Sequence, residues 1–412
     1  MSNSMKRLLT ITAIVMLVAT VGFFTAHAAS HSQARANAEA QMENAKFVGA
    51  DSCKGCHADA HQGWAATVHG DMIQDAKVAM KAEARAMLEY ALKNPAEKIP
   101  AGKFTSGWKE TPTYGDLLKY GPHKDSAKEG SISSLDDIKY TVGGKWKQRY
   151  VVQTDDGHVF LRFQYYWTTE DGKDNNPRVH TYGETRSYED RCLACHSTGY
   201  DYDLSNKIDR TVASGYQLTD VVADLGVSCE ACHGPGSAHI ANISKDREAG
   251  LANIINPAEF TNQQQLDACG ACHARNNKWH ENTYRNDTPK FLIGDNLDEL
   301  VEIARIEHTP KRFHDDGVGS SHRMEYNDME QGPKAGMTCT TCHNVHKENT
   351  LKMEFSALCA SCHGPDHGYD IDKVMPKRAK SSNIPDIRTH TFILDENGNA
   401  VGNPDFKASA KK

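Results

Sequence analysis

The sequence predicts a fold that is mainly α-helical and irregular, with one small β-hairpin inserted in its first half. All twelve cysteines fall into six copies of one motif, Cys-x-x-Cys-His, whose two cysteines are about one helical turn apart. A stretch between the first two copies, about residues 139–168, is instead rich in aromatic and β-branched residues. Only 39% of the 412 residues are hydrophobic, so groups other than side chains must supply much of the core.

The repeated motif is the signature of covalent c-type haem attachment. Each cysteine thiol adds to a vinyl group of the haem, and the adjacent histidine provides the proximal ligand to the iron. Six copies that use every cysteine predict six covalently bound haem c groups and a fold built around packed haems. The cysteines are Cys53, Cys56, Cys192, Cys195, Cys229, Cys232, Cys269, Cys272, Cys339, Cys342, Cys359 and Cys362, and the proximal histidines are His57, His196, His233, His273, His343 and His363.

Two other uses of the cysteines have to be weighed. Cys-x-x-Cys pairs also build zinc ribbons, and Cys229, Cys232, Cys269 and Cys272 would supply four thiolates. A zinc site, however, does not require the histidine that follows every second cysteine here. Disulfides are common in exported chains, but disulfide pairing gives no reason for one repeated spacing. Haem attachment is therefore the prediction.

The N-terminus has the three parts of a secretory signal peptide, expected over residues 1–28. Met1 to Arg7 carries positive charge, Leu8 to Phe24 is apolar, and Ala26-His27-Ala28 gives the small-x-small pattern of a cleavage site. The apolar run is near the lower length limit for a membrane span, so an uncleaved anchor is the alternative. Bacterial haem attachment takes place outside the cytoplasmic membrane, so we expect a periplasmic protein, or one secreted onward to the cell surface.

The charge balance favours protein partners over nucleic acid. The formal net charge is −7 before any haem propionate is counted, and an acidic surface disfavours nucleic-acid binding. Such a surface instead suits docking against basic patches of redox partners, where charge mainly raises the encounter rate. The expected partners are a quinol-linked donor and a downstream cytochrome or reductase.

The spacing of the motifs indicates the organisation of the chain. A linker over 29–46 leads into a hexahaem domain over 47–368, and an extended arm over 369–412 follows. Within the domain the first motif stands alone, the next three follow closely, and the last two form a tight pair. Two long insertions separate these three groups.

The first insertion holds the clearest secondary-structure patterns. Apolar residues recur at helical spacing over Asp71–Lys93, with Asp71 as the expected N-cap. Two strands, Lys147–Gln153 and His158–Trp167, flank an Asp156-Gly157 turn and predict a β-hairpin. We expect the aromatic cluster at 165–167 to be part of the sheet core. The second insertion predicts a short helix near Asn296–Glu307 and then a histidine-rich loop.

The number of histidines favours bis-histidine ligation of the haems. This arrangement fills both axial positions of each iron, leaves no position for a substrate, and suits electron transfer at low potential. Of the 21 histidines, six are proximal and two lie at the signal peptide. The remaining candidates for the distal side are His61, His69, His123, His158, His180, His239, His280, His308, His314, His322, His346, His367 and His390.

Local spacing separates good candidates from poor ones. His346 follows His343 by three residues on nearly the same helical face, so it would ligate a neighbouring haem and draw the two porphyrins together. His239 comes six residues after His233, beyond a Gly-Pro turn, and would do likewise. For isolated histidines such as His123 and His158 we expect surface positions rather than ligation.

Several segments resemble the multihaem cytochrome family that contains the tetrahaem electron carrier of nitrifying bacteria, the cytochrome c-554/c-552-like proteins. The likeness runs from about Phe47 to Leu394. The segment that carries it most clearly reads Gly-Val-Ser-Cys-Glu-Ala-Cys-His-Gly-Pro-Gly-Ser-Ala-His and ends at His239. The other similar segments are Cys192–Gly199, Ser321–Asp328, Gly336–His346 and Ile387–Phe392.

The resemblance implies a set of distal ligands. In that family, histidines in these settings are distal, which implies this role for His69, His239, His322, His346 and His390. The sixth ligand is open among His180, His308 and His314, and we take His308 as the prediction. Similar proteins often carry another Cys-x-x-Cys-His before the position of Met375, but this chain has no cysteine there. His390 is then either structural or a ligand to another haem.

The leading functional hypothesis is an electron carrier, and not an enzyme. The competing class is a multihaem oxidoreductase with one open haem that acts on a small nitrogen or sulfur oxyanion or on hydroxylamine, as the resemblance to the wider superfamily implies. A third class is a self-associating subunit of an extracellular cytochrome filament. The Cys-x-x-Cys-Lys motif that often marks the open haem of ammonifying nitrite reductases does not occur in this chain.

Overall fold

The computed structural model describes residue 40 and residues 45–403 apart from short internal gaps. The gaps are 102, 105–109, 122–128, 145–146, 167–177, 182–186, 280–283, 286–287, 290, 292, 333–335, 348–350, 366–369 and 381–384. The expected signal peptide and most of the expected linker lie outside the described residues. So do Trp167, His123, His280 and His367.

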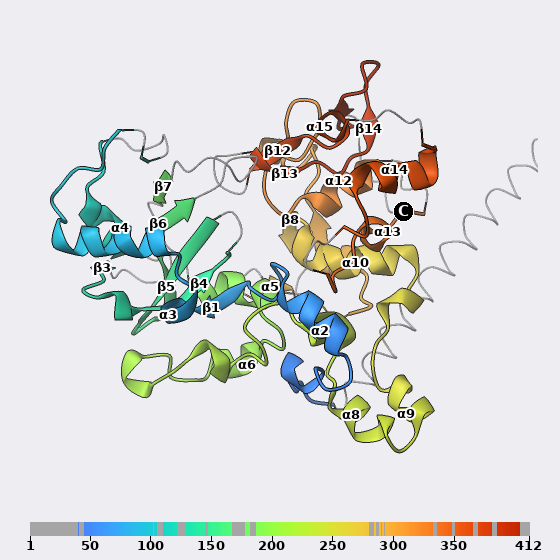
Figure 1. The fold of residues 1–412 in the computed structure, drawn as a ribbon, viewed down its shortest axis with the longest axis horizontal. Helices are drawn as coiled ribbons and strands as arrows, with labels where there is room; N and C mark the ends of the chain where they lie inside the picture. The colour runs from blue at the N-terminus through green and yellow to red at the C-terminus, as the bar shows by residue number, and fades with distance from the viewer. Residues whose placement is uncertain are drawn as a thin grey trace, which may run out of the picture.

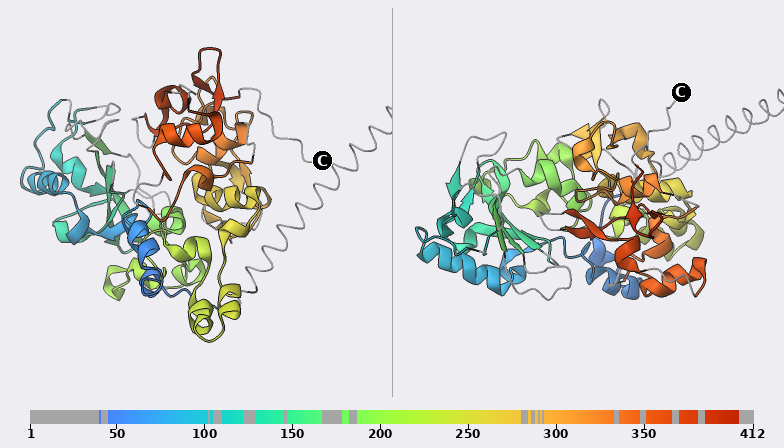
Figure 2. Two further views of the ribbon diagram at one scale, coloured as in Figure 1. Left: turned by 45° about the vertical axis from the view of Figure 1, so that its right-hand side comes forward. Right: turned by 90° about the horizontal axis from the view of Figure 1, so that it is seen from above.

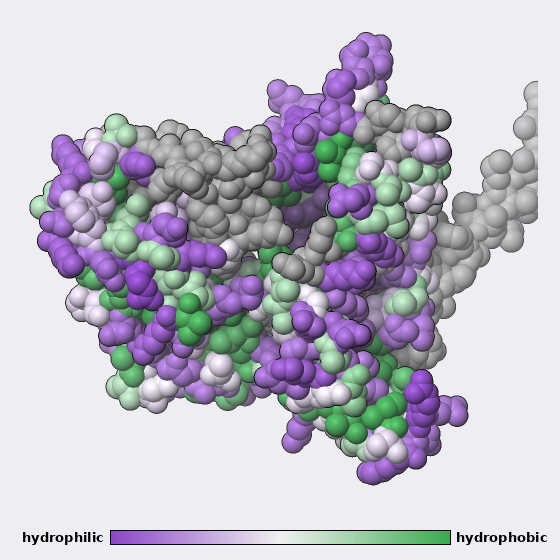
Figure 3. Space-filling view, in the orientation of Figure 1, coloured by the Kyte–Doolittle hydropathy of each residue, from purple (hydrophilic) through white to green (hydrophobic). Residues whose placement is uncertain are grey.

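The molecule consists of a β-sheet region and a helical region, which lie side by side in Figures 1 and 2. The sheet region holds most of the insertion between the first two motifs, and the helical region holds the motifs themselves. Within the described ranges, no helix is both long and apolar enough to cross a membrane. Apolar side chains gather over α8 and α9 at the lower right of Figure 3, where Ile240 and Leu251 are exposed.

The sheet has seven antiparallel strands in the order β1-β4-β5-β6-β2-β3, and β7 also pairs with β6. The predicted hairpin is its centre, with Thr154 opposite Gly157 across the turn. The prediction of only a small hairpin is wrong because the flanking strands are too short to show an alternating pattern. The strands are β1 (Ile73–Asp75), β2 (Lys119–Tyr120), β3 (Gly130–Ser131), β4 (Ile138–Val142), β5 (Lys147–Thr154), β6 (Gly157–Tyr166) and β7 (Arg178–Thr181).

Both faces of this sheet are buried, because successive side chains of a strand point to opposite faces. On one face Tyr150 belongs to a core with Leu88 of helix α4 (Ala82–Lys93). On the other face Val151 and Phe160 belong to a core with Tyr188, which lies just before the second motif. The sheet is therefore packed directly against a haem-attachment segment.

The long helix predicted over Asp71–Lys93 is in fact three elements. Strand β1 comes first, the short helix α3 (Ala76–Ala79) follows, and α4 begins after an extended residue, Met80. The cap of α3 is Asp75, whose side chain accepts from the backbone N–H of Lys77 at 2.8 Å, so the prediction of Asp71 as the cap is wrong. The predicted end at Lys93 is confirmed.

The helices that carry the motifs are short, because each motif needs only one helical turn. Four of them end at the proximal histidine, which places its ring at the helix terminus. The helices of this region are α2 (Ala58–Ala65), α5 (Ala194–His196), α6 (Tyr202–Ser205), α7 (Cys229–His233), α8 (Ser237–Ile243), α9 (Arg247–Ala252), α10 (Asn262–His273), α12 (Glu325–Gln331), α13 (Cys339–Cys342) and α14 (Phe355–His363), together with a π-helix, η4 (Glu189–Leu193).

Short 3₁₀ turns connect these elements. They are η1 (Ala50–Ser52), η2 (Tyr114–Leu118), η3 (Leu135–Asp137), η5 (Val212–Ser214), η6 (Leu218–Asp220), η7 (Pro257–Glu259) and η8 (Pro310–Arg312).

The helix expected near Asn296–Glu307 is shorter than predicted. It is α11 (Leu297–Leu300), and the chain then continues as strand β11 (Val301–Ile303), which pairs with β8 (Asn276–Trp279). The alternation of buried Val301 and Ile303 with Glu302 suits a strand rather than a helix. A further strand pair is β9 (Tyr284–Arg285) with β10 (Thr288–Pro289).

The C-terminal arm packs along α12. The Asp328 carboxylate accepts from the Thr389 hydroxyl at 2.9 Å and from the His390 backbone N–H at 3.0 Å, and Thr389 is fully buried. This contact fixes the position of His390. The elements of the arm are α15 (Ile371–Val374), β12 (Lys377–Lys380), β13 (Pro385–Arg388), β14 (Ile393–Leu394) and β15 (Ala400–Val401).

Candidate functional site

The twelve cysteines are all free thiols, and none is in a disulfide. Among the side chains that the structure describes, no group of three or more histidines, cysteines or acids converges as a metal-ion ligand set. Free, partly accessible thiols in pairs are what covalent haem attachment requires.

Thiols of different motifs lie next to one another. Such contacts make the thiols of several motifs neighbours in space, although most of the connected motifs are far apart in the sequence. The contacts are hydrogen bonds between Cys53 and Cys229, between Cys195 and Cys272 and between Cys269 and Cys339, and an electrostatic interaction of Cys342 with Cys359 and Cys362. They connect motif one to three, two to four, four to five, and five to six.

Four of the six proximal histidines lie close to a histidine from elsewhere in the chain. The separations between ring centroids are 6.4 Å for His57 and His239 (the motif-one pair), 6.1 Å for His233 and His346 (the motif-three pair), 6.3 Å for His273 and His69 (the motif-four pair) and 6.4 Å for His343 and His390 (the motif-five pair).

These separations fit two imidazoles that share one iron. A metal–imidazole bond is about 2 Å long, and the coordinating nitrogen lies roughly 1 Å from its ring centre, so two axial rings have centroids about 6 Å apart. Imidazoles in van der Waals stacking would lie closer together. The spacing therefore leaves room for a haem between the members of each pair.

A fifth arrangement brings His196 of motif two near His322. Burial and then the positive charges of Arg323 and Arg149 lower the pKa of His196 to about 3. The pKa of His322 is lowered to about 2 by burial, by positive residues led by Arg275, and by His196 itself. We call His196 and His322 the motif-two pair. Neutral imidazole is the form that binds a metal.

Three other distal candidates, His69, His346 and His390, also have lowered pKa values. Burial and then the charge of His273 lower the pKa of His69 to about 4. Burial lowers the pKa of His346, with a smaller contribution from His233, and burial is also the main reason that the pKa of His390 is lowered.

Hydrogen bonds to Nδ1 orient several of these rings. Nδ1 of His233 lies 2.8 Å from the carbonyl of Ile255, and Nδ1 of His239 lies 2.8 Å from that of Gly250. Nδ1 of His390 likewise lies 3.0 Å from the Arg388 carbonyl. A carbonyl only accepts, so Nδ1 carries the proton and Nε2 is left to bind the iron.

Two proximal histidines have side-chain partners instead. Nδ1 of His196 lies 3.0 Å from the hydroxyl of Tyr188, and Nδ1 of His273 lies 3.4 Å from the carboxylate of Glu325. The carboxylate raises the pKa of His273 in spite of its burial, and a charged partner of this kind makes an imidazole a stronger donor to a metal.

Glu230, inside the third motif, holds the motif-one pair together. Its carboxylate is 3% exposed and accepts from the backbone N–H groups of Val48 at 3.0 Å, Gly49 at 2.9 Å and Gly236 at 2.7 Å. Val48 and Gly49 lead into motif one, and Gly236 caps the helix that carries His239. One carboxylate therefore brings both segments together.

The segment that carries His69 is docked on the chain just before motif three. Trp64 donates from Nε1 to the carbonyl of Val227 at 2.8 Å, and the His69 carbonyl accepts from the Val227 N–H at 3.0 Å. Gly226 has a φ of +121°, and a Cβ there would lie 2.9 Å from the His69 carbonyl oxygen. Glycine is therefore required for this close approach.

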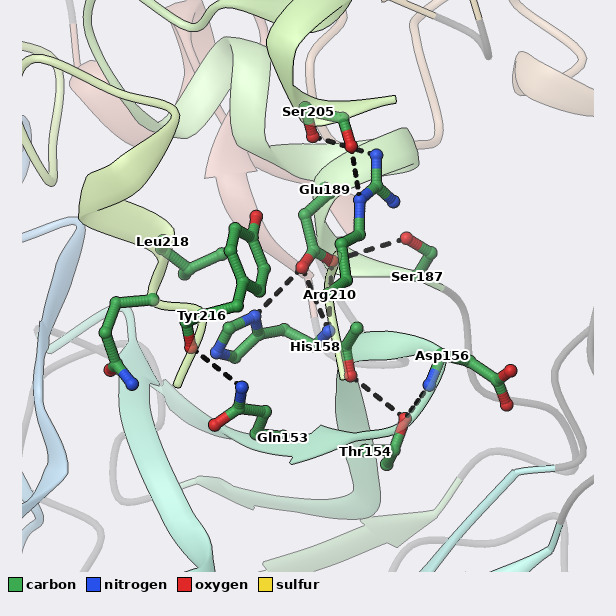
Figure 4. Close-up of polar contacts among 12 residues, drawn as sticks. Gln153, Thr154, Asp156, His158, Ser187, Glu189, Ser205, Arg210, Tyr216 and Leu218 are labelled. Atoms are coloured by element: carbon green, nitrogen blue, oxygen red, sulfur yellow. Dashed lines mark hydrogen bonds and ion pairs between the residues drawn. The ribbon is translucent and has the colours of Figure 1, made fainter. Parts of the chain in front are cut away.

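A buried hydrogen bond links the sheet to motif two, as Figure 4 shows. His158 on β6 and Glu189 on η4 are both fully buried, with 2.9 Å between Nδ1 and the carboxylate, which also accepts from the His158 backbone N–H at 3.0 Å. The expectation that His158 is a surface histidine is wrong, because the strand turns it inward. Arg210 pairs with the neighbouring Asp190 at 3.2 Å.

Motif six attaches the sixth predicted haem, and its predicted proximal histidine is His363. His363 is exposed at the end of α14, and the prediction of His308 as its partner stays a prediction. Nε2 of His308 lies 3.0 Å from Glu307 and 3.3 Å from Glu302, while Nε2 of His314 lies 3.3 Å from the Arg378 carbonyl. The side chain of His180 lies outside the described part.

Sequence reasoning did not identify the residues that support the ligands. Tyr188, Glu189, Glu230, Glu325 and Asp328 belong to no repeated pattern. Only their positions beside a motif or a distal histidine would have marked them.

Two family models match parts of this chain. The model described as cytochrome c554 and c-prime matches residues 163–234, and that of the doubled CXXCH motif matches residues 332–368. The first match includes motifs two and three, and the second includes motifs five and six.

Among known proteins, the chain is similar to the multiheme cytochrome MtrA of Shewanella baltica (strain OS185). The two are 24% identical over 189 residues, which are 43% of this chain and 54% of MtrA, so the chain spans about half the length of that relative. The fold is similar to that of the outer cell wall cytochrome OcwA, with a TM-score of 0.53 and 17% identity over 87% of this chain and 83% of the other.

Proposed function

We propose that this chain, a multihaem c-type cytochrome by its motifs and relatives, transfers electrons between redox partners through six mostly bis-histidine haems. The observation that carries the proposal is the set of histidine pairs about 6 Å apart at the ring centroids. When both axial positions of an iron are filled by protein, the site exchanges electrons but does not bind a substrate.

The residues have distinct roles in this proposal. The twelve cysteines attach the haems, which supply the one-electron chemistry when bound. The motif-one to motif-five pairs hold five of the irons, and His363 with His308 is the proposed pair for the sixth. The hydrogen bonds to Nδ1 fix the rings of His196, His233, His239, His273 and His390, so that little rearrangement accompanies a change of charge at the iron.

The thiol contacts support a continuous route through the protein. Motifs two, four, five and six form one series of neighbours, and motifs three and one are in contact with each other. Cys232 of motif three interacts electrostatically with Cys269 and Cys272 of motif four, which joins the two groups. We propose that a quinol-linked donor and a downstream cytochrome or reductase dock at different ends of this array. We also propose export to the periplasm or cell surface, with residues 1–28 as the cleaved signal.

Haem count and ligation state test the proposal together. The mass of the mature holoprotein and its pyridine haemochrome spectrum give the number of haems. Electron paramagnetic resonance of the oxidised protein, with and without cyanide or nitrite, reports the axial positions. Six haems with only low-spin signals that added ligand does not change are the expected result. A high-spin signal that disappears on adding nitrite would contradict the carrier and favour an oxidoreductase with an open haem.

A further inference from the structure

The motif-two and motif-four sites are neighbours with opposite electrostatic surroundings. The Cys195 thiol hydrogen-bonds the Cys272 thiol, so the two attachment points are in contact. Reduction of an iron adds one negative charge to its site. Fixed positive charges stabilise the reduced state, and fixed negative charges stabilise the oxidised state.

Positive side chains surround the distal side of motif two. Nη2 of Arg275 lies 3.0 Å from each ring nitrogen of His322, and its Nε donates to the His322 carbonyl at 2.9 Å. Arg323 has a φ of +60°, which a non-glycine residue rarely adopts, and its Nε is buried without a hydrogen-bond partner. Arg312 also lies nearby. Its pKa is lowered mainly by burial and further by the charge of Arg323.

The proximal side of motif two is also positive. The Arg149 guanidinium carbon lies 3.4 Å from the centroid of the Phe160 ring, which packs edge-on against Tyr188 at 5.1 Å. The Tyr188 hydroxyl in turn contacts His196. The charges of Arg149 and Lys147 both reach His196, where they add to the effect of burial in lowering its pKa.

Two acidic residues lie just before motif two, and each has a partner of its own. Asp190 pairs with Arg210 at 3.2 Å. Glu189 follows Tyr188, but its carboxylate binds His158, as Figure 4 shows. The positive charges at motif two are therefore not matched by this carboxylate.

Motif four has a negative partner instead. The Glu325 carboxylate lies 3.4 Å from Nδ1 of His273, and it interacts electrostatically with His390 of the motif-five pair as well. Glu325 is the partly buried first residue of α12, and its carboxylate is held beside the proximal histidine. A carboxylate bonded to the proximal histidine favours the oxidised iron.

We propose that these fixed charges give the motif-two site a higher reduction potential than the neighbouring motif-four site. This inference rests on the proposed electron-transfer function and predicts the direction in which electrons move between these two sites. Electrons would collect at motif two, beside the β-sheet, rather than at the centre of the array. Arg149 and Glu325 act through the axial histidines and are therefore positioning residues for the redox step.

The test is a potentiometric titration of the holoprotein followed by electron paramagnetic resonance. His322→Ala and His69→Ala each free one axial position, and so identify the signals of motifs two and four. Arg149→Gln should lower the reduction potential of the motif-two site by about 59 mV, which is about a tenfold change in the equilibrium constant for one electron. Glu325→Gln should raise the motif-four potential by a similar amount.

Matched controls use the same substitutions elsewhere on the same elements. Arg162→Gln changes an arginine of the sheet that binds the Gly121 carbonyl, and Glu330→Gln changes a glutamate of α12 that binds Arg305. Neither should move the two potentials.

Two results would overturn the inference. One is a motif-two potential equal to or below that of motif four. The other is an Arg149→Gln or Glu325→Gln variant whose potentials match its control, as expected if haem propionates neutralise the arginines. In both cases six low-spin haems would still be present and the proposed function would stand. Loss of low-spin ligation in the wild type would instead contradict the proposed function itself.

Discussion

Replacing Glu230 with glutamine should separate the two segments that carry the motif-one pair. The carboxylate is buried and accepts from three backbone N–H groups, which are those of Val48, Gly49 and Gly236. Glutamine keeps one acceptor oxygen but turns an NH₂ group toward these donors. Hydrogen bonds to a charged acceptor contribute about 1.5–3 kcal/mol each and neutral ones about 1 kcal/mol. The loss of one bond and the weakening of the others predict a decrease of about 3 kcal/mol in the free energy of unfolding.

Denaturant unfolding of the holoprotein measures this decrease, and cyanide titration measures its local effect. Because Gly236 caps the helix of His239, loosening it should free the distal position of motif one and produce one high-spin haem that binds cyanide. Glu248→Gln, an exposed substitution on the adjacent α9, is the control and should change stability by less than about 0.5 kcal/mol. A Glu230→Gln variant as stable as the control, with only low-spin haems, would refute the reasoning.

Three further predictions concern the sheet contact, the ligand planes and the response to acid. Glu189→Ala should destabilise the fold by about 3 kcal/mol in denaturant unfolding, because it leaves the buried His158 without its partner; a change below about 1 kcal/mol would contradict this. The ring planes cross at 71° in the motif-four pair and at 17° in the motif-three pair, so low-temperature spectra should contain both a strongly anisotropic and a rhombic low-spin signal. The haem-free chain should lose stability as the pH falls below about 6.5, because the histidines of the motif-two pair bind protons more readily unfolded than folded. Circular dichroism across pH 4–8 checks this sign, and a stability that rises toward acid would be inconsistent with it.

Features that depend on local spacing could be predicted from the sequence. The six motifs, the turn between β5 and β6, and the end of α4 at Lys93 each depend on residues only a few positions apart. The other strands of the sheet could not be predicted in this way. Strands of two or three residues carry too little pattern, and β1 was hidden inside an apolar stretch that also suited a helix.

In the candidate functional site, too, only the residues that depend on local spacing could be predicted from the sequence. His239 and His346 follow their neighbouring motifs so closely that local geometry indicated a role at another haem. The burial of His158 was not visible in the sequence, because it depends on Glu189 from a different element. The effect of the Glu325 carboxylate on the pKa of His273 was not visible in the sequence either, because helix α12 approaches His273 only in the folded protein.

By itself the sequence determined that this protein carries six Cys-x-x-Cys-His motifs, and it predicted a haem at each of them, because attachment chemistry needs residues within a single helical turn. Only the tertiary structure decided which second histidine lies beside motifs one, three, four and five, and which charges surround it. Those neighbours come from distant segments, such as His69 beside motif four and His390 beside motif five. Their approach depends on buried hydrogen bonds and close backbone packing, which no local spacing encodes.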